Sequence, residues 1–471
     1  MTWAEREFGH AALGDARRSR RLCAMAARAA ERPSGRVSAV FDREKEREGA
    51  YDFLESEHVA ASSVADAMFR ATVERTSGHR AVFVALDFSS LTLTDDDESK
   101  DFGVLGASNR PCRGVLMVNA LAVSPVGVPL GLVDQQFWTR SERQSGTLRE
   151  KVKRNLNRPF EDKQGAWFMR SVKATIARLA PAEVVPWFVI DREADSRHIL
   201  ERFKDEPCLF TIRGTKDRTL AQAEKDSSVR AALLKKAPLA KMVVDVRRTG
   251  KRPPRSAEVE VRAKEVELRF RQLGISPEAT MKVHAVWVRE LVRVPGKEEQ
   301  LDWMLYTNAP ITSAEAALQV VESYRARWRV EEFHRTWKQG ECEVETTQLR
   351  SLEAVVKWAT ILAAVAVRIE RLKYLSRSEP DLPASVEFLP IEIEAMKLER
   401  EMRAEGKRIK LPDMPTLAQA THWIAELGGW IGKRNGPPGS ITLARGLDRL
   451  SIYVAAIHTV DFKRSRRSRT K

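Results

Sequence analysis

The stretch Tyr324–Lys338, YRARWRVEEFHRTWK, places four chemically active side chains along one side of a predicted helix. Counting about 100° of rotation per residue from Tyr324, the other three lie at about −60°, −20° and −40°. These three are Arg327, Glu331 and Lys338. The opposite face is apolar, with Val330, Phe333 and Trp337. The spacing predicts an amphipathic helix that packs on a core, although a charged stripe is also typical of a solvated helix face.

Two aspartates follow apolar runs elsewhere in the chain. Asp87 comes after residues 81–86, AVFVAL, and Asp191 comes after residues 184–190, VVPWFVI. Each run predicts a buried strand, and in open α/β sheets ligands gather where such strands end. An aspartate at this place is also a common turn or capping residue. Convergence of Asp87 and Asp191 with Glu331 would require cations, because the repulsion would raise the three pKa values, and hard divalent metals suit carboxylates.

Glu332 is an alternative to Glu331 as the third acid. It lies at about 80° on the same count and leaves the stripe. Glu331 is therefore the predicted ligand.

Three blocks of the sequence resemble a known family. YRARWRVEEFHRTWK, VALDFSS (84–90) and FVIDREAD (188–195) resemble the bacterial DDE transposases of the insertion-sequence-four group, whose helix carries a Tyr-x2-Arg-x3-Glu-x6-Lys motif. The likeness continues in ALGDARRSRRL (12–22), EGAYDFL (48–54) and LGGW (427–430), so it covers most of the chain. One departure is Val118-Asn119, which stands where a member of the group has His-Ser.

This resemblance implies an enzyme with a metal-dependent mechanism. Asp87, Asp191 and Glu331 would hold two Mg²⁺ ions, with Mn²⁺ expected to substitute, while Tyr324, Arg327 and Lys338 would position phosphate oxygens. The implied reactions are nicking at the transposon end, hairpin formation, hairpin opening and joining of the 3′ ends to target DNA. The implied partners are double-stranded DNA, as terminal inverted repeats and as target, and a second copy of the chain in a synaptic homodimer.

Several further residues are expected to contact DNA. Arg17, Arg18 and Arg21 lie within about 100° of one another on a predicted helix that opens at Ala16 after an Asp15 cap, and the resemblance gives them recognition of the transposon end. Without the resemblance, an arginine cluster is equally typical of a solvated helix face. Trp303, in LDWML (301–305), resembles the tryptophan that holds a flipped base, and it offers a π face for one, although a core tryptophan is an equal alternative. Arg192 and Arg213 complete the predicted DNA-binding set.

The pattern of strands and helices predicts an α/β chain with a ribonuclease-H-like catalytic domain. A hairpin is expected from 115–123 and 128–137, a helix at 166–179 and a strand at 208–213, and alternation at 258–262 and 282–288 predicts half-exposed strands. The expected domains are 1–75, helical and binding DNA ends; 76–375, catalytic, with an inserted β-subdomain at 214–312; and 376–471, helical, for dimerisation and DNA contact. The last nine residues carry six basic side chains and are expected to form a disordered tail that binds DNA nonspecifically.

Composition agrees with a polyanionic partner, because 80 Lys plus Arg against 65 Asp plus Glu give a net charge of +15. The four cysteines are far apart and form no CxxC pair, which argues against a zinc knuckle or a secreted disulfide framework. The apolar run at 359–367 is too short for a bilayer, and no signal sequence is visible, so a bacterial cytoplasmic, nucleoid-associated protein is expected. Two other classes remain open: a DNA-binding transposition inhibitor that does not cut, and a stand-alone ribonuclease-H-like nuclease.

Overall fold

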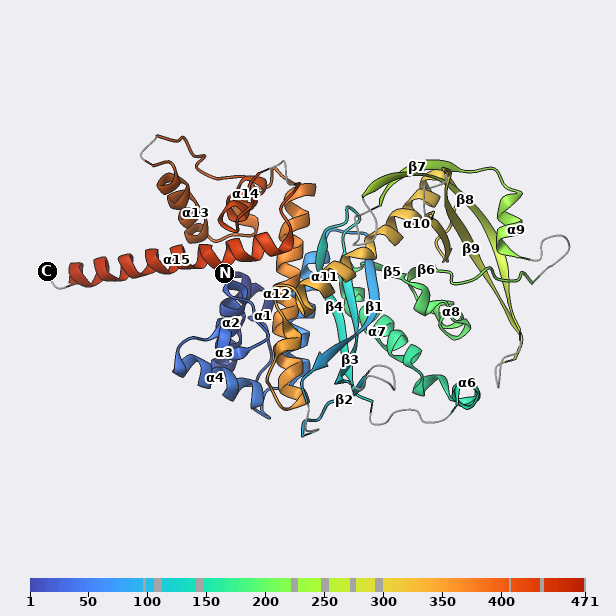
Figure 1. Cartoon of the computed structure of the whole chain (residues 1–471), viewed down its shortest axis with the longest axis horizontal. Coiled ribbons are helices and arrows are strands. Elements are labelled where there is room, and N and C mark those ends of the chain that lie inside the picture. The colour runs from blue at the N-terminus through green and yellow to red at the C-terminus, as the bar shows by residue number, and fades with distance from the viewer. Residues whose placement is uncertain are drawn as a thin grey trace.

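A ten-stranded mixed sheet runs through the molecule, and helices cover both of its faces (Figure 1). The computed structural model describes residues 1–95, 99–105, 112–140, 147–221, 228–246, 254–271, 277–292, 300–405, 408–432 and 436–469. Along the sheet the strand order is β2-β3-β1-β5-β6-β10-β9-β8-β7, and β4 pairs with β3.

Six strands form the half of the sheet that carries the two aspartates. Strand β3 pairs antiparallel with both β1 and β4, whereas β5 runs parallel to β1 and β6 parallel to β5. The predicted hairpin is confirmed, with Gly127 at φ 87° in its turn, a conformation that glycine adopts readily. The strands are β1 (Ala81–Leu93), β2 (Gly103–Leu105), β3 (Cys112–Val123), β4 (Pro129–Trp138), β5 (Val185–Ile190) and β6 (Leu209–Arg213).

The other four strands extend this sheet. Strand β10 pairs antiparallel with β6, and β9, β8 and β7 follow in order, so the predicted insertion continues the catalytic sheet through backbone hydrogen bonds. Both long alternating segments are strands, as predicted. The elements are β7 (Ala240–Val246), β8 (Arg255–Phe270), β9 (Ala279–Glu290), β10 (Asp302–Thr307) and the short helix α9 (Val229–Leu234).

Side-chain alternation divides β1 and β5 between two cores. Phe83, Ala85, Trp187 and Val189 face one core, which the N-terminal, catalytic and C-terminal helices share. The intervening residues of both strands face the second core, which includes residues of α7 and α8. Because successive side chains of a strand point to opposite faces, Asp87 and Asp191 continue the first set. Helices α7 (Gln164–Leu179) and α8 (Arg197–Phe203) contribute residues to the second core, and α6 (Leu148–Asn157) precedes them in the chain.

The motif-bearing segment forms two consecutive helices, α10 (Ala314–Ala326) and α11 (Trp328–Lys338). One continuous helix was expected, but the α-helical hydrogen bonding is interrupted at Arg327. There the amide of Arg327 donates to the Tyr324 carbonyl, and the amide of Val330 donates to the Arg327 carbonyl, both tighter than α-helical spacing. Arg327 itself keeps helical dihedrals, φ −53° and ψ −34°. The break therefore leaves the side-chain stripe largely in place.

The N-terminal segment is helical, as predicted, and the Asp15 side chain accepts from the Arg17 amide as the expected cap. Helix α5 packs against β4 as well as against α1, so the boundary expected at residue 75 falls inside a packed region. The helices are α1 (Trp3–Phe8), α2 (Ala16–Glu31), α3 (Val37–Val40), α4 (Glu44–Glu55) and α5 (Ala61–Thr76).

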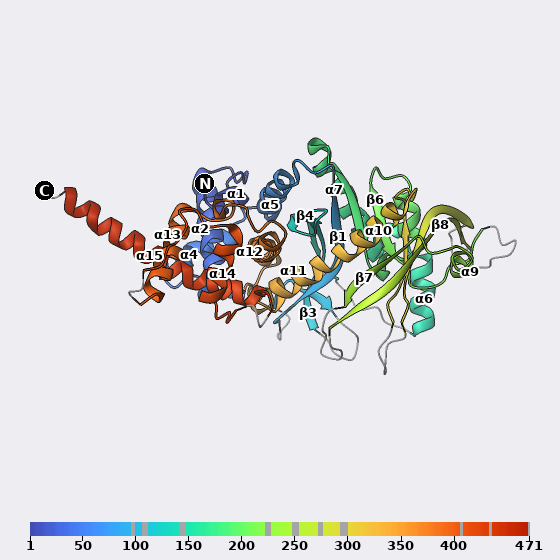
Figure 2. The ribbon, with the colours of Figure 1, turned by 90° about the horizontal axis from the view of Figure 1, so that it is seen from above.

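Helix α12 (Leu352–Ser378) stands between the N-terminal helices and the sheet (Figures 1 and 2). Its apolar stretch, 359–367, is buried throughout, as expected for a core helix. Within the described ranges, no helix combines the length and apolarity that crossing a membrane would require.

The C-terminal part is also helical, with α13 (Pro390–Arg403), α14 (Leu417–Leu427) and α15 (Ser440–Arg469). Helix α15 extends away from the body in both views. The expected disordered tail is wrong for residues 463–469, because α15 continues through them; residues 470–471 lie outside the described residues. Short 3-10 turns complete the chain: η1 (Phe160–Asp162), η2 (Ala180–Ala182), η3 (Arg192–Ala194), η4 (Val344–Thr346) and η5 (Ala384–Val386).

Candidate active site

Strand β1 and helix α11 bring two of the three acids together. Ligand atoms of Asp87, Glu331 and His334 all lie within 4.8 Å of one another. The Arg327 guanidinium lies between the acids, with Nη1 3.5 Å from Asp87 Oδ1 and 3.2 Å from Glu331 Oε1. His334 Nδ1 is 3.5 Å from Asp87 Oδ2. The stripe predicted on the helix therefore faces the carboxylate of β1.

Asp191 lies on the neighbouring strand but outside that close group. Leu86 and Ile190 are register partners of the parallel β1–β5 pair, so the residue after each lies at the same level of the sheet. Asp191 then caps η3, accepting from the Glu193 amide at 2.8 Å. Its charge is near enough to raise the pKa of Asp87. Asp87 and Glu331 thus meet directly, with Asp191 beside them.

The electrostatics of Asp87 favour a bound cation. Burial raises its pKa well above the usual range and the Glu331 charge raises it further, while Arg327 opposes the shift. Partial burial and the charges of Asp191 and Glu331 also raise the pKa of Glu193. Several hard oxygen donors that repel one another are the donor set that a divalent ion such as Mg²⁺ prefers. The residues present therefore fit a divalent metal.

Adjacent glutamates on α11 have different surroundings. Glu331 faces Arg327 and Asp87, whereas Glu332 is buried and accepts from the Tyr374 hydroxyl at 2.6 Å and from Arg329 at 3.3 Å. Glu332 thereby joins α11 to α12, away from Asp87. The geometry favours Glu331 as the acid of the site.

The two remaining motif residues flank this centre. Lys338 Nζ lies 3.3 Å from Ser89 Oγ, two residues beyond Asp87, and 3.5 Å from Glu345. Tyr324 is buried, with 6% of its surface exposed. Its ring meets Trp303 of β10 edge to face, with centroids 5.4 Å apart. Trp303 therefore packs on the motif tyrosine and is half-buried.

Two family models match separate parts of the chain. Residues 1–59 match the family described as Transposase DNA-binding, and residues 169–368 match the family described as Transposase DDE domain. The chain therefore carries the domains of a DDE transposase. Asp191 and Glu331 lie inside the second match, and Asp87 lies between the two matched ranges. A DDE domain implies a ribonuclease-H-like fold and the use of a divalent metal, and the mixed sheet and the acidic cluster agree with this.

Within the transposase DNA-binding match, α2 presents a different arginine set from the predicted one. Arg17 is exposed, with 83% of its side-chain surface free, and Arg21 is exposed beside Gly49 of α4. Arg18 instead donates to the backbone carbonyl of Leu13 at 3.0 Å and contacts that of His58, which fastens α2 to the turn between α4 and α5. The third exposed arginine is Arg20, which the sequence analysis missed.

The helical wheel explains this difference. The buried face of α2 is centred at about 150° from Arg17, and Arg18 at about 100° falls within its range of about 80° to 220°. This face consists of Leu22, Met25, Ala26, Ala29 and Ala30. Arg20, at about −60°, lies on the opposite side. The position of the apolar residues was therefore the signal that could have separated Arg18 from Arg20.

The other two predicted DNA-binding arginines differ in exposure. Arg192, in η3 next to Asp191, is exposed. Arg213 is half-buried and contacts the Asp302 carbonyl at 3.5 Å, across the β6–β10 junction. Arg192 is thus exposed beside Asp191, whereas the Arg213 side chain also contacts β10.

Two residues in or beside this candidate site were not singled out from sequence. Trp328, next to Arg327, exposes 40% of its surface, unusual for a tryptophan. His334 is buried, and burial together with the Lys338 and Arg327 charges lowers its pKa to about 3, so it is neutral at neutral pH. Its angle of about −80° from Tyr324 falls near the motif stripe, so the same periodicity could have found it.

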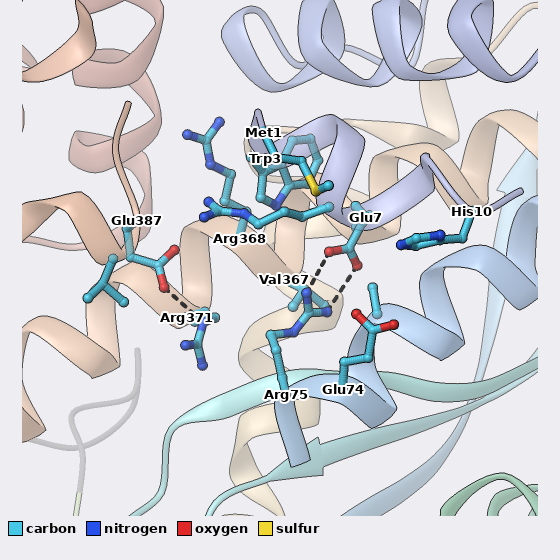
Figure 3. A pocket seen from close by; sticks show the side chains of 14 residues that line it. Met1, Trp3, Glu7, His10, Glu74, Arg75, Val367, Arg368, Arg371 and Glu387 are labelled. Atoms are coloured by element: carbon cyan, nitrogen blue, oxygen red, sulfur yellow. Dashed lines mark hydrogen bonds and ion pairs between the residues drawn. The ribbon is translucent and has the colours of Figure 1, made fainter. Parts of the chain in front are cut away.

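A pocket of about 270 Å³ lies apart from this site, between α1, α5 and α12 (Figure 3). Arginines and glutamates line it in pairs: Arg75 donates to Glu7 at 2.7 and 3.0 Å, and Arg371 donates to Glu387 at 3.1 Å. The first pair joins α5 to α1, and the second joins α12 to the end of η5. None of the predicted site residues lines this pocket.

Proposed function

We propose that this chain is a cut-and-paste transposase of the insertion-sequence-four group. It would bind the inverted repeats at its transposon ends, cleave them with a hairpin intermediate and join the 3′ ends to target DNA. The observation that carries the proposal is the meeting of Asp87 and Glu331 around Arg327, with Asp191 at the adjacent strand end. Support for the subgroup comes from the complete Tyr-Arg-Glu-Lys spacing.

In the proposed mechanism the three acids, Asp87, Asp191 and Glu331, would hold two Mg²⁺ ions, for which Mn²⁺ would substitute. When bound, the metal lowers the pKa of water and stabilises charge on the departing oxygen of an in-line displacement at phosphorus. Arg327 neutralises the two nearest carboxylates and can fork onto a phosphate, and Lys338 supplies a point charge near Ser89. Tyr324 orients the DNA strand that is cut, and its buried hydroxyl must become accessible for this role.

DNA contact is assigned to two regions. The exposed α2 arginines, Arg17, Arg20 and Arg21, form one surface within the DNA-binding match, and they are suited to phosphates or base edges. Arg192 and Arg213 lie close to the Asp191 strand end. Residues 1–75 would recognise transposon ends, residues 76–375 would cleave them, and residues 376–471 would dimerise and contact DNA.

A synaptic homodimer follows from the need to hold two ends together. Support comes from α15, which projects from the body (Figure 1) and exposes Ile452 at 65%. An extended helix with apolar residues outward is suited to a second copy. A protein of this kind would act in the bacterial cytoplasm, on the nucleoid.

The function is tested by mixing purified protein with the inverted repeats that flank its coding region, in the presence of Mg²⁺. We expect excised fragments with hairpin ends, resolved on denaturing gels. Ordinary nicks without hairpins would point to a ribonuclease-H-like nuclease, and retarded but uncut DNA would point to a transposition inhibitor. Omitting Mg²⁺ is the control and should leave bound, uncut DNA.

Replacement of Trp303 by alanine should slow hairpin formation roughly tenfold while changing the first nick little. A tight DNA turn unstacks a base, and stacking on an aromatic ring contributes about 1–3 kcal/mol, whereas the first nick needs no unstacked base. Time courses that resolve nicked and hairpin products measure the two steps. Trp303→Phe keeps a ring against Tyr324 and should recover most of the rate. Equal slowing of both steps would show that Trp303 only supports Tyr324.

A further inference from the structure

A row of polar side chains crosses the sheet beneath α11 and α12. Asp87, Asn119 and Gln135 are directly opposite one another on β1, β3 and β4, because Asp87 pairs with Asn119 and Asn119 pairs with Gln135. Asn119 is 0% exposed and Gln135 is 7% exposed. A buried amide without hydrogen bonds is costly, so this row must be held by specific partners.

Both amides of the row, Asn119 and Gln135, have partners at hydrogen-bond distance. Gln135 Nε2 donates to Asn119 Oδ1 at 2.7 Å, and Asn119 Nδ2 is 2.8 Å from His334 Nε2. At the far end, Thr360 of α12 donates to Gln135 Oε1 at 3.4 Å. At the near end, His334 Nδ1 faces Asp87 Oδ2 at 3.5 Å. One continuous path therefore runs from α12 to the carboxylate of the site.

The chemistry at the carboxylate end relates the direction of each bond to the role of His334. An aspartate that binds metal is ionised and only accepts, so His334 can hydrogen-bond it only as a donor. His334 must then carry its proton on Nδ1, which leaves Nε2 to accept from the Asn119 amide. Asn119 Oδ1 is left to accept from Gln135, as the observed contacts have it.

We infer that His334 is a positioning residue, kept in the Nδ1–H tautomer by Asn119 and Gln135, whose N–H holds the Asp87 carboxylate toward the metal site. The inference rests on the proposed function, because it takes Asp87 as a metal ligand. Outer groups that orient a ligand typically change metal affinity or activity about 10- to 100-fold when removed. Catalytic hydrogen bonds are often long in structures without ligands, so the 3.5 Å contact between Nδ1 and Asp87 is compatible with this role.

The competing role for His334 is that of a metal ligand, since its Nδ1 lies within the 4.8 Å group. That role needs a free lone pair on Nδ1 and the proton on Nε2, donated to Asn119. Every amide in the row would then point the other way. The tautomer of His334 therefore separates the two roles.

Nitrogen NMR of isotope-labelled histidine, in the presence of Mg²⁺ and without DNA, reads the tautomer directly. The His334 resonance is assigned as the one missing from His334→Asn. A proton on Nδ1 is expected, and a proton on Nε2 would overturn the inference. Because this reading requires no cleavage, failure of the wild type to cut DNA would count against the proposed function alone.

Asn119→Asp tests the same inference by reversing the row. A carboxylate at this position only accepts, so it forces the proton onto Nε2 and turns a lone pair toward Asp87. We expect about 10- to 100-fold weaker Mn²⁺ binding by calorimetry, and a matching loss of cleavage. Tighter Mn²⁺ binding would overturn the inference, because a carboxylate partner makes a ligating imidazole more basic.

Variants of His334 complete the test, because an asparagine amide nitrogen can occupy the Nδ1 position and a glutamine one the Nε2 position. His334→Asn should therefore keep cleavage within about tenfold of wild type, and His334→Gln should lose about 100-fold, with equal DNA retardation and similar urea midpoints. In Thr360→Val, Asn119 still sets the tautomer of His334, so the cleavage rate should remain within about threefold of wild type. Equal losses in His334→Asn and His334→Gln would mean that His334 serves only packing.

Discussion

Asp191→Asn should abolish strand cleavage, by on the order of 10³-fold or more, and leave binding to the transposon end unchanged. The substitution removes a charge from the proposed metal site, where several kcal/mol of transition-state stabilisation depend on the metal. Asparagine caps helices as well as aspartate does, so η3 should keep the contact between residue 191 and the Glu193 amide. Cleavage is followed on gels with labelled ends, and binding by electrophoretic retardation.

Glu193→Gln is the matched control for Asp191→Asn. Glu193 is exposed, lies two residues away and loses the same charge, but it is not one of the proposed ligands. It should retain cleavage within about tenfold of wild type, because it removes a nearby charge that acts on the site only through its electrostatic field. If Asp191→Asn lost cleavage and binding equally, Asp191 would be structural. If both variants lost cleavage equally, Glu193 would belong to the site.

Arg327→Ala should reduce cleavage by about 10²-fold or more and move the acid limb of the pH profile to higher pH. Burial and the charge of Glu331 raise the pKa of Asp87, and Arg327 is the charge that opposes this rise. Without the guanidinium the pKa of Asp87 rises further, so the carboxylate that binds metal forms only at higher pH. The cleavage rate falls further because the variant also lacks the positive charge that Arg327 places beside the reacting phosphate.

The measurement for Arg327→Ala is the first-strand cleavage rate against pH at one fixed Mg²⁺ concentration. Arg325→Ala is the control, because Arg325 pairs with Glu322 at 2.6 Å on the same helix and is not among the residues that shift Asp87. Its profile should keep the wild-type position. An unshifted acid limb in Arg327→Ala would mean that Arg327 does not act through the carboxylates.

Sequence periodicity predicted the local elements of the site well. The apolar runs before Asp87 and Asp191 are strands, and the Val330, Phe333 and Trp337 face of α11 is fully buried. Beyond its apolar run, however, β1 continues through Asp87 to Leu93. The reason is that β3 remains paired along that segment, from Asp87 with Asn119 to Leu93 with Arg113.

Features that depend on long-range pairing could not be predicted in this way. The union of β6 with β10 joins strands far apart in the chain, and no local pattern specifies such a pair. The buried row of Asn119, Gln135 and Thr360 has the same cause, because these residues come from two strands and a helix and become neighbours only after folding. By contrast, the position of Arg18 near the buried face of α2 and that of His334 near the motif stripe were within reach of a helical wheel.

Helix α12 determines how the whole chain holds together. Buried Lys357 donates to the carbonyls of Leu54 and Ser56 at 3.0 and 2.9 Å, and the Trp358 indole donates to that of Gly35 at 2.8 Å. The same helix contacts β4, α11, α14 and α15. Helix α12 thus packs against three parts of the chain: the N-terminal helices, which carry the DNA-binding match, the catalytic sheet and the C-terminal helices. The cooperative unit of unfolding is therefore larger than any one of the three regions to which a separate task is assigned.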